Sequence, residues 1–195
     1  MSSLRAAQKQ LTRRLLLESG LDTFEAKGYA AATVDDIASG AGTTRTTFYL
    51  HFPSKAELIK ALVVDIYEDR RGTEVTPLME VVASGERGQI RGWLAHRFEQ
   101  WPSTMRKVTA AQQAAACEPD IGEVIESWFE GIVGEIHQAL DMAERFDPES
   151  RHIRDVLSFG QLEFLSRRWQ FEGWDVDRDR ALETLTDSWC HLLCE

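Results

Sequence analysis

The chain has 195 residues, with 22 Lys and Arg against 32 Asp and Glu, so its formal net charge at pH 7 is −10. This length suits one or two small domains and is sufficient to bury a hydrophobic core. The sequence contains no run of 18 apolar residues and no apolar signal region at its start, and its three cysteines lack the spacing of a disulfide framework. We therefore expect a cytoplasmic protein without a transmembrane span, and do not expect secretion.

The charge is unevenly distributed along the chain. Residues 1–62 carry eight basic and six acidic side chains, whereas residues 63–195 carry 14 and 26. A positive field in the N-terminal third favours contact with a polyanion there, and the acidic remainder would help to orient the approach. We expect residues 1–9 to be mobile. They could lie along phosphates as a basic arm, and a frayed, solvated terminus is an equally good interpretation.

Apolar residues recur at helical spacing through the N-terminal third. The pattern predicts a first helix over residues 10–27, two short helices over 34–40 and 44–50, and a long fourth helix from Ser54 to about residue 71. Gly42 can take the positive φ that a sharp turn between the short helices requires. This arrangement is typical of a helix-turn-helix, although a small capped helix pair that only packs on a core has the same spacing.

The segment 33–52 contains the signals of such a motif. Thr33 is a good N-cap for the first short helix, and Asp36 follows three residues later, where a negative charge suits a helix N-terminus. A helix that enters a major groove needs small or donor side chains near its N-terminal end and no negative charge. The outer face of the second short helix meets this requirement, since it carries Thr44, Arg45, Thr46, Tyr49 and His51.

The rest of the sequence also predicts helices, and no segment has the pattern of a strand. Two of the expected boundaries are prolines, because Pro102 should end one helix and Pro148 should begin another. In chain order, helices are expected over residues 78–83, 89–101, 104–117, 119–146, 149–172 and 178–194. The fold class is therefore all-α, with about nine or ten helices. The helix over 149–172 is apolar on more than one face and should be buried on several sides.

The C-terminal region contains all six tryptophans, and polar side chains share their helical faces. A buried polar group without a partner is costly, so each one pairs, reaches water or meets a ligand. Arg97 and Glu163 could form an internal ion pair, and each tryptophan could be ordinary core. We interpret the mixture as a mainly apolar ligand site with one or two polar anchors. The candidates are Trp93, Arg97, Trp101, Gln112, Trp128, Phe159 and Glu163.

Other chemistry finds little support in the sequence. Cys190 and Cys194 lie four residues apart beside His191, but a metal site would need further ligands. Cysteine also behaves as a small hydrophobic residue in an interface, which is the interpretation we favour. No paired carboxylates, nucleophile–base pair or metal spacing is evident, so we expect no enzyme activity, no cofactor and no metal.

The N-terminal 65 residues resemble the DNA-binding domain of the tetracycline-repressor (TetR) family of bacterial transcriptional regulators. The chain departs from the usual family pattern at Ser19-Gly20, where Ala-Ala is common, and at Thr43, where Val or Ile is common. The matching positions are Thr12-Arg13, Leu16-Leu17, Phe24, Gly28-Tyr29, Thr33-Val34, Ile37-Ala38, Ala41-Gly42, Phe48-Tyr49, His51-Phe52, Ser54-Lys55 and Glu57-Leu58.

The resemblance implies a homeodomain-like helix-turn-helix domain over residues 10–70, with the motif at about 33–52. A C-terminal helical bundle over 72–195 would bind a small effector and form a homodimer through about residues 149–172 and 178–194. Carried over by position, the side chains that would touch base edges are Thr44, Arg45 and Thr46. Those that would hold phosphates of a double-stranded operator are Thr33, Tyr49, His51 and Lys55.

The function implied is that of a ligand-responsive transcriptional repressor, released from a palindromic operator by a small, largely apolar or aromatic effector. The alternative is a DNA-binding regulator whose pocket is filled by its own side chains and which no small molecule controls.

Overall fold

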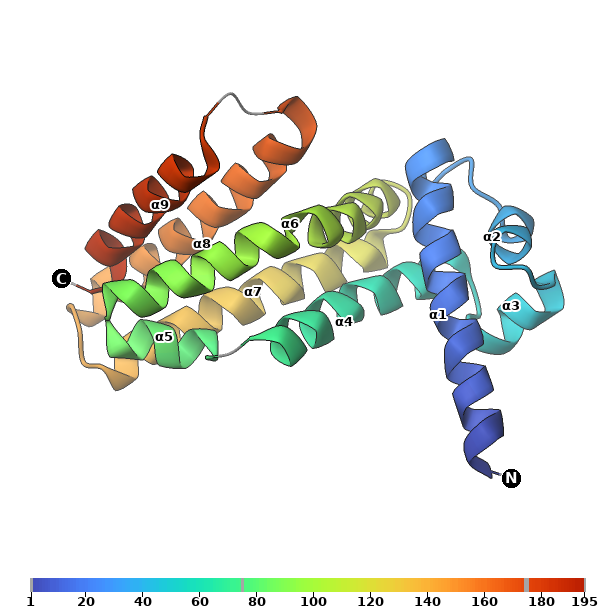
Figure 1. Cartoon of the computed structure of the whole chain (residues 1–195), viewed down its shortest axis with the longest axis horizontal. Coiled ribbons are helices and arrows are strands. Elements are labelled where there is room, and N and C mark those ends of the chain that lie inside the picture. Colours follow the sequence, from blue (N-terminus) through green and yellow to red (C-terminus); the bar gives the residue numbers. More distant parts are fainter. Residues whose placement is uncertain (1, 75, 174–175, 195) are drawn as a thin grey trace. The chain divides into compact units, whose positions relative to one another are not determined.

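The computed structural model describes residues 2–74, 76–173 and 176–194. Within these ranges every regular element is a helix, which confirms the predicted all-α fold, and the nine helices agree with the expected nine or ten (Figure 1). They are α1 (Ser2–Lys27), α2 (Val34–Gly40), α3 (Arg45–His51), α4 (Lys55–Thr73), α5 (Leu78–Ser84), α6 (Arg87–Ala115), α7 (Pro119–Met142), α8 (Pro148–Glu172) and α9 (Arg178–Leu193). None of the helices in the described ranges is long and apolar enough to cross a membrane.

The chain forms two compact units. The first contains Met1–Glu68 and Arg106–Glu126, and the second contains Asp69–Met105 and Ser127–Glu195, so that α4, α6 and α7 contribute to both. This division by packing differs from the two functional domains expected from the sequence. The second half of α6 belongs to the first unit because Arg106 Nη2 donates hydrogen bonds to Asp22 and Glu25 of α1, at 2.7 Å each.

The core of the first unit explains the departures from the family pattern at Ser19 and Gly20. A Cβ on Gly20 would lie 2.8 Å from Leu58 Cδ2, so glycine allows α1 and α4 to approach closely. The Ser19 hydroxyl donates to the Ile37 carbonyl at 2.8 Å and thereby ties α1 to α2. The residues contacted, Leu58 through its side chain and Ile37 through its carbonyl, are both fully buried. These two substitutions therefore fit the packing of the unit.

The expectation that residues 1–9 form a mobile arm is wrong over the described residues, because α1 begins at Ser2. The segment contains Ala6, Ala7 and Lys9, which favour helix, and it extends a helix that residues 10–27 have already nucleated. Leu4 and Leu11 remain exposed along this extension. Residue 1 lies outside the described residues.

The expected break at Pro102 is also wrong, because α6 continues from Arg87 to Ala115 with Pro102 inside it. A proline removes one helical hydrogen bond, which costs about 3 kcal/mol in a free helix. Buried aromatic packing on the preceding turn offsets that cost, since Phe98 and Trp101 stack with ring centroids 3.8 Å apart. Tertiary contacts here override local propensity.

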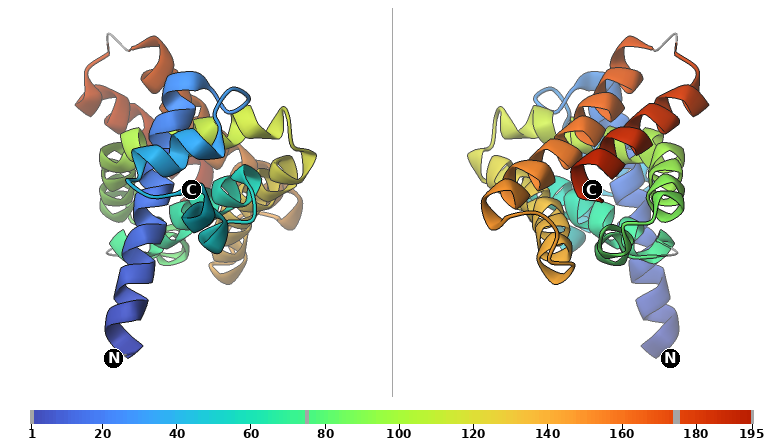
Figure 2. Two further views of the ribbon diagram at one scale, coloured as in Figure 1. Left: turned by 90° about the vertical axis from the view of Figure 1, so that its right-hand side faces the viewer. Right: turned by 90° about the vertical axis from the view of Figure 1, so that its left-hand side faces the viewer.

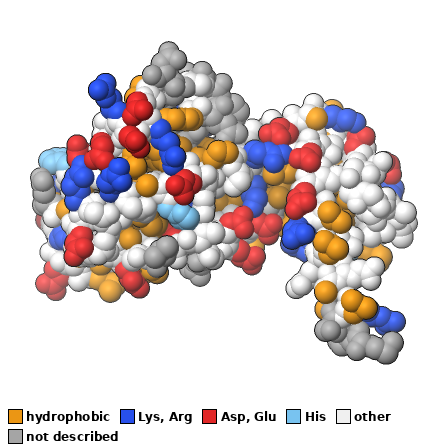
Figure 3. All heavy atoms as spheres, in the orientation of Figure 1, with side chains coloured by type: hydrophobic (Ala, Val, Ile, Leu, Met, Phe, Trp, Pro, Cys, Tyr) orange, Lys and Arg blue, Asp and Glu red, His pale blue; other side chains and the backbone are white. Residues whose placement is uncertain are grey.

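The second unit packs α8 and α9 as an antiparallel pair (Figures 1 and 2). Figure 3 shows side chains of both charges gathered on the face of the second unit that it draws. Helices α6 and α9 are joined by ion pairs of Arg87 with Glu183 and Asp187. The expectation that α8 is buried on several sides is wrong for a single chain. Four of its large apolar side chains are 42–57% exposed, namely Ile153, Val156, Leu157 and Phe164.

Candidate functional site

Helix α2 begins with a reciprocal capping box. Thr33 Oγ1 accepts a hydrogen bond from the Asp36 amide at 3.1 Å, and the Asp36 carboxylate accepts one from the Thr33 amide at 3.1 Å. The Lys27 ammonium donates to the same carboxylate at 2.7 Å. These bonds, first from Lys27 and then from Thr33, lower the pKa of Asp36 to about 2. Thr33 is thus the N-cap that the sequence predicted, and its hydroxyl is engaged within the protein.

The turn between α2 and α3 follows from one glycine and one threonine. Gly42 has a φ of 65°, and the Thr43 amide donates to the Ala38 carbonyl at 2.9 Å, which closes the end of α2. Thr44 is then the N-cap of α3, because its Oγ1 accepts from the Thr47 amide at 3.2 Å. The turn therefore fixes the direction of α3 relative to α2, and Thr44, Arg45 and Thr46 at the start of α3 are exposed to solvent.

The outer face of α3 exposes side chains predicted to contact bases, Arg45 and Thr46, and one predicted to contact phosphate, Tyr49. Asp35 of α2 pairs with the first of them. Arg45, Thr46 and Tyr49 are all exposed. Arg45 Nη1 donates to Asp35 at 2.8 Å, and Arg45 Nη2 donates to the Tyr49 hydroxyl at 3.4 Å. The hydrogen bond and charge of Asp35 raise the pKa of Arg45. The pair is solvated, and such pairs are weak in water, so Arg45 can exchange Asp35 for a nucleic-acid acceptor.

His51 and Lys55 are placed differently from free surface donors. Burial, followed by the charges of Lys9 and Arg13, lowers the pKa of His51 and favours its neutral form. The Lys55 ammonium donates to the carbonyls of Tyr29 and Ala32 at 2.7 and 2.8 Å, and therefore has one donor left. Their expected roles on phosphates remain predictions, and the structure limits what each side chain can offer.

A cavity of about 290 Å³ lies in the second unit. Trp93 forms part of its wall and stacks on Trp189, with ring centroids 5.6 Å apart. The sequence did not single out the other polar wall residues, which include Glu74, Gln89 and His96. Glu74 follows α4 directly, 19 residues before Trp93, and no local spacing connects the two positions.

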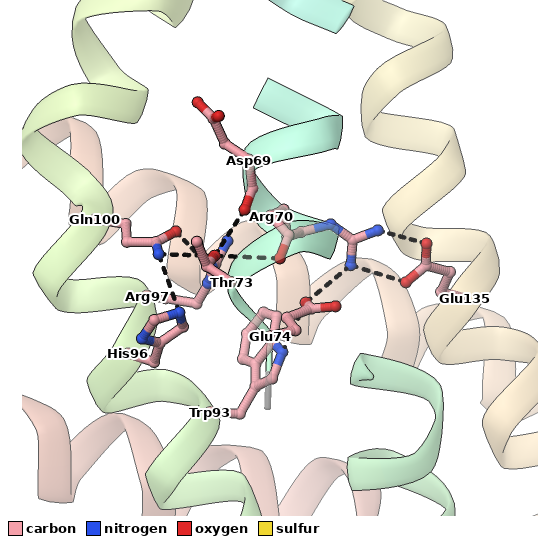
Figure 4. A network of polar contacts seen from close by, with 9 residues as sticks. All are labelled: Asp69, Arg70, Thr73, Glu74, Trp93, His96, Arg97, Gln100 and Glu135. Atoms are coloured by element: carbon pink, nitrogen blue, oxygen red, sulfur yellow. Dashed lines mark hydrogen bonds and ion pairs between the residues drawn. The ribbon is translucent and has the colours of Figure 1, made fainter. Parts of the chain in front are cut away.

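Glu74 is the centre of a polar network beside this cavity (Figure 4). The Trp93 indole donates to Glu74 Oε1 at 3.0 Å, and Arg70 Nη1 lies 3.3 Å from the same oxygen. Arg70 also makes two hydrogen bonds to the Glu135 carboxylate on α7. The last turn of α4 is thereby connected to α6 and α7 within the second unit.

Arg97 lies in this network without a carboxylate partner among the described residues. Its side chain is 9% exposed, Nη2 donates to Gln100 at 2.6 Å, and Cζ lies 5.5 Å from the Trp93 ring centroid. Its Nε makes no hydrogen bond within the described part of the chain. Burial is the largest influence on this guanidinium and lowers the pKa of Arg97 to about 10. The possible pair with Glu163 does not form, since Gln100 takes its place.

The remaining candidate ligand residues do not form one wall. Gln112 belongs to the first unit, whereas the other six belong to the second. Trp128 and Phe159 meet edge to face at 6.4 Å, and Trp101 stacks on Phe98 in the core. Glu163 is half-buried. Of the predicted set, Trp93 lines the cavity, and Arg97 contacts the Trp93 ring without being one of the lining residues.

These features define a class of protein: a DNA-binding regulator with a helix-turn-helix whose second helix presents hydroxyl and guanidinium groups. Residues 16–62 match the family described as bacterial regulatory proteins, tetR family. The regulator TtgR of Pseudomonas putida is 41% identical over 205 residues, covering 95% of this chain and 93% of that protein. The chain belongs to the TetR family of transcriptional regulators. The match to SrpR of P. putida spans only 63 residues, which are 32% of this chain and 30% of that protein.

Solved structures share the fold at lower sequence identity. The flavonoid-responsive regulator FrrA superposes with a TM-score of 0.68 at 19% identity and covers 93% of this chain and 94% of its own. NalD, the secondary repressor of the MexAB-OprM multidrug efflux pump in Pseudomonas aeruginosa, has a TM-score of 0.66 at 18% identity, with 94% and 97% covered. At these identities the likeness concerns the fold.

Proposed function

We propose that this regulator is a homodimeric repressor that a small, largely apolar effector releases from a palindromic operator. The cavity at Trp93 is the observation that carries the effector part of the proposal. Its volume of about 290 Å³ is at the lower end of small-molecule sites, and its wall combines apolar and aromatic groups with a few polar ones. FrrA is a flavonoid-responsive regulator and NalD is a repressor, which supports testing both properties here.

The proposed operator contacts follow from the exposed face of α3. Thr44, Arg45 and Thr46 would face base edges, and Thr33, Tyr49, His51 and Lys55 would face phosphates. Two recognition helices in a dimer would lie about 34 Å apart, in successive major grooves. Helix α3 offers one long donor, Arg45, so base readout would be sparse and operator shape would contribute to recognition.

The proposed release mechanism uses helix α4. This helix starts directly after the helix-turn-helix, and its final turn carries Arg70 and Thr73 of the polar network. An effector that displaces the Trp93–Glu74 hydrogen bond would shift this turn. The coupling required between the effector and operator sites is about 1–3 kcal/mol, which is typical of allosteric proteins.

The proposed dimer buries the uncovered face of α8. Four large apolar side chains of this one helix are 42–57% exposed, which favours an interface over a monomer surface, and α9 packs alongside. We assign the interface to about residues 149–172 and 178–194. Cys190 and Cys194 are half-buried there, consistent with packing.

The test is an operator-release assay on the full chain, using a duplex selected from random DNA. Labelled operator is titrated with a panel of planar aromatic and acyl compounds, including flavonoids, and release is followed by fluorescence anisotropy. Gly92→Leu should abolish release and leave operator affinity unchanged, because Gly92 lines the cavity and a Cβ there meets no atom within 4 Å. The matched control is Gly88→Leu, on the same helix with equally open space, which should respond normally.

The competing function is a regulator with a filled pocket. The stacking of Trp93 on Trp189 and of Trp101 on Phe98 favours it, because these rings already pack against one another. If no compound in the panel releases the operator from the wild-type protein, the effector proposal fails and this alternative stands. If Gly92→Leu responds as the wild type does, the cavity at Trp93 is not the effector site and that part of the proposal fails.

A further inference from the structure

Two histidines and an aspartate from different helices meet at the turn between α7 and α8. His137 lies in the last third of α7, and His152 and Asp155 lie in the first turns of α8. The chain reverses between the helices through residues with positive φ, Glu144 at 51° and Phe146 at 61°. The spacing of 15 residues between the histidines gives no metal motif in the sequence, and only the reversal brings them together.

The distances within this cluster suit one metal ion. His137 Nδ1 lies 2.7 Å from Asp155 Oδ2, and His152 Nδ1 lies 3.6 Å from Asp155 Oδ1. One nitrogen or oxygen from each of the three residues falls within 4.8 Å of the others. Ligand atoms about 2.0–2.2 Å from a tetrahedral zinc ion are roughly 3.4 Å apart, so small rotations of the two rings would bring all three into coordination.

Asp155 supplies an independent reason to expect a cation. Its side chain is 0% exposed, and the histidine facing its second oxygen is too distant for a hydrogen bond. Asp155 Oδ1 has no hydrogen-bond partner among the residues that the structure describes. A buried carboxylate oxygen without a partner is costly, and buried polar groups are otherwise nearly always satisfied. An ion pair with His137 provides a partner for Asp155 Oδ2 alone. Asp155 Oδ1, which faces His152, is left without a hydrogen bond among the described residues.

Asp141 and Arg151 hold the His137 ring and the α7–α8 reversal in position, as outer-shell residues do around a metal ion. His137 Nε2 lies 3.5 Å from Asp141 Oδ2, and the other Asp141 oxygen accepts a hydrogen bond from Arg151 at 2.6 Å. Arg151 also donates to the carbonyls of Arg145 and Phe146, which holds the reversal in place. When Nδ1 of His137 binds an ion, its proton is released and the ring carries its proton on Nε2, facing Asp141. Carboxylates in this position orient metal-bound histidines.

We propose that His137, His152 and Asp155 bind one divalent transition-metal ion of the Zn²⁺, Co²⁺ or Ni²⁺ class, with water completing its coordination. Two imidazole nitrogens and one carboxylate suit these ions, whereas Mg²⁺ and Ca²⁺ prefer oxygen ligands throughout. The His152 side chain is 77% exposed in the single chain, where an ion can reach it from solvent. The ion links α7 to the start of α8, and the site is separate from the cavity at Trp93.

The experiment uses the full chain without a histidine tag, treated with chelator and then titrated with CoCl₂ and, in competition with a chromophoric chelator, with ZnCl₂. We expect one ion per chain and a visible Co²⁺ spectrum without an intense near-ultraviolet thiolate band. His152→Ala, at an exposed position that does not endanger folding, should weaken binding by more than about 100-fold. Asp141→Asn should weaken it by about 10- to 100-fold, as the loss of an outer-shell partner does.

The control is His191→Gln, an exposed histidine beside Cys190 and Cys194, which should leave the affinity unchanged. Asp155→Asn should abolish the rise in melting temperature that ZnCl₂ gives the wild-type protein. The proposal is overturned if the wild type shows no saturable binding of either ion, or if His152→Ala binds as tightly as wild type. A thiolate band, or loss of binding in His191→Gln, would place the ion at the cysteines and would equally overturn it.

Discussion

The substitution Arg97→Met tests whether the buried guanidinium of Arg97 lowers the folding stability of the protein. Arg97 is 9% exposed, donates to Gln100, and has no carboxylate partner among the described residues. Replacing such a charge by an apolar side chain of similar length is often neutral or stabilising. We expect Arg97→Met to be more stable than wild type and to bind effector less tightly, because a polar group beside the cavity is lost.

The magnitude follows from the environment of the guanidinium. A pKa lowered to about 10 by burial corresponds to about 3 kcal/mol of disfavoured charge. Methionine gives up the contact over the Trp93 ring and the hydrogen bond to Gln100, together about 2 kcal/mol. The net gain is about 1 kcal/mol, which raises the melting temperature of a chain of this size by about 2–4 °C.

Arg70→Met is the matched control, because Arg70 is similarly buried but ion-paired. Its side chain is 4% exposed and contacts the carboxylates of Glu74 and Glu135. Removing it leaves both acids without that partner, so the variant should lose about 3–5 kcal/mol. Thermal unfolding of both variants at pH 7, followed by circular dichroism, compares them directly. If the melting temperature of Arg97→Met falls as far as that of Arg70→Met, then the interactions of Arg97 in the folded protein offset the cost of burying its charge. The reasoning is then refuted.

Three further outcomes are expected. Arg45→Ala should weaken operator binding about 5- to 150-fold in anisotropy titrations while sedimentation shows an intact dimer; unchanged affinity removes it from the base-reading set. The pKa of Asp36 is lowered to about 2, so its stabilising effect is present above the unfolded pKa near 4 and is lost as the pH falls towards 2. Asp36→Asn should therefore reduce the pH dependence of the unfolding free energy in that range, and an unchanged acid-unfolding curve would contradict this. Leu157→Glu should give a monomer by light scattering, whereas Met142→Glu, at another exposed apolar position, should not.

Local signals explain why the helix-turn-helix was predictable from the sequence. The Thr33 cap, the glycine turn and the Thr44 cap act within a few residues of one another, so the boundaries of α2 and α3 agree with expectation to within one residue. The break expected at Pro102 was wrong because aromatic packing from elsewhere in the fold decides that position. The helix-breaking tendency of proline describes an isolated peptide, and packing within a folded protein can override it.

The polar groups around the cavity and at the α7–α8 turn were not predictable for a different reason. Glu74 meets Trp93 through the packing of two helices, and His137 meets His152 through a chain reversal. Lys55 has the sequence context of a phosphate contact, yet backbone carbonyls of the segment between α1 and α2 accept its hydrogen bonds. Side-chain partners of this kind depend on tertiary geometry, which periodicity does not encode.

The extended α1 changes how the DNA-binding surface obtains its positive charge. Helix α3 itself offers little, since His51 favours its neutral form and Arg45 is paired with Asp35. Arg13 of α1 lies over the Phe52 ring at 5.2 Å, and the charges of Lys9 and Arg13 help to lower the pKa of His51. Of these two cations, Lys9 belongs to the segment expected to be a mobile arm, and it lies on α1 together with Arg13. In the proposed operator complex, a cation held on a helix would lose less conformational entropy on meeting a phosphate than one on a mobile arm.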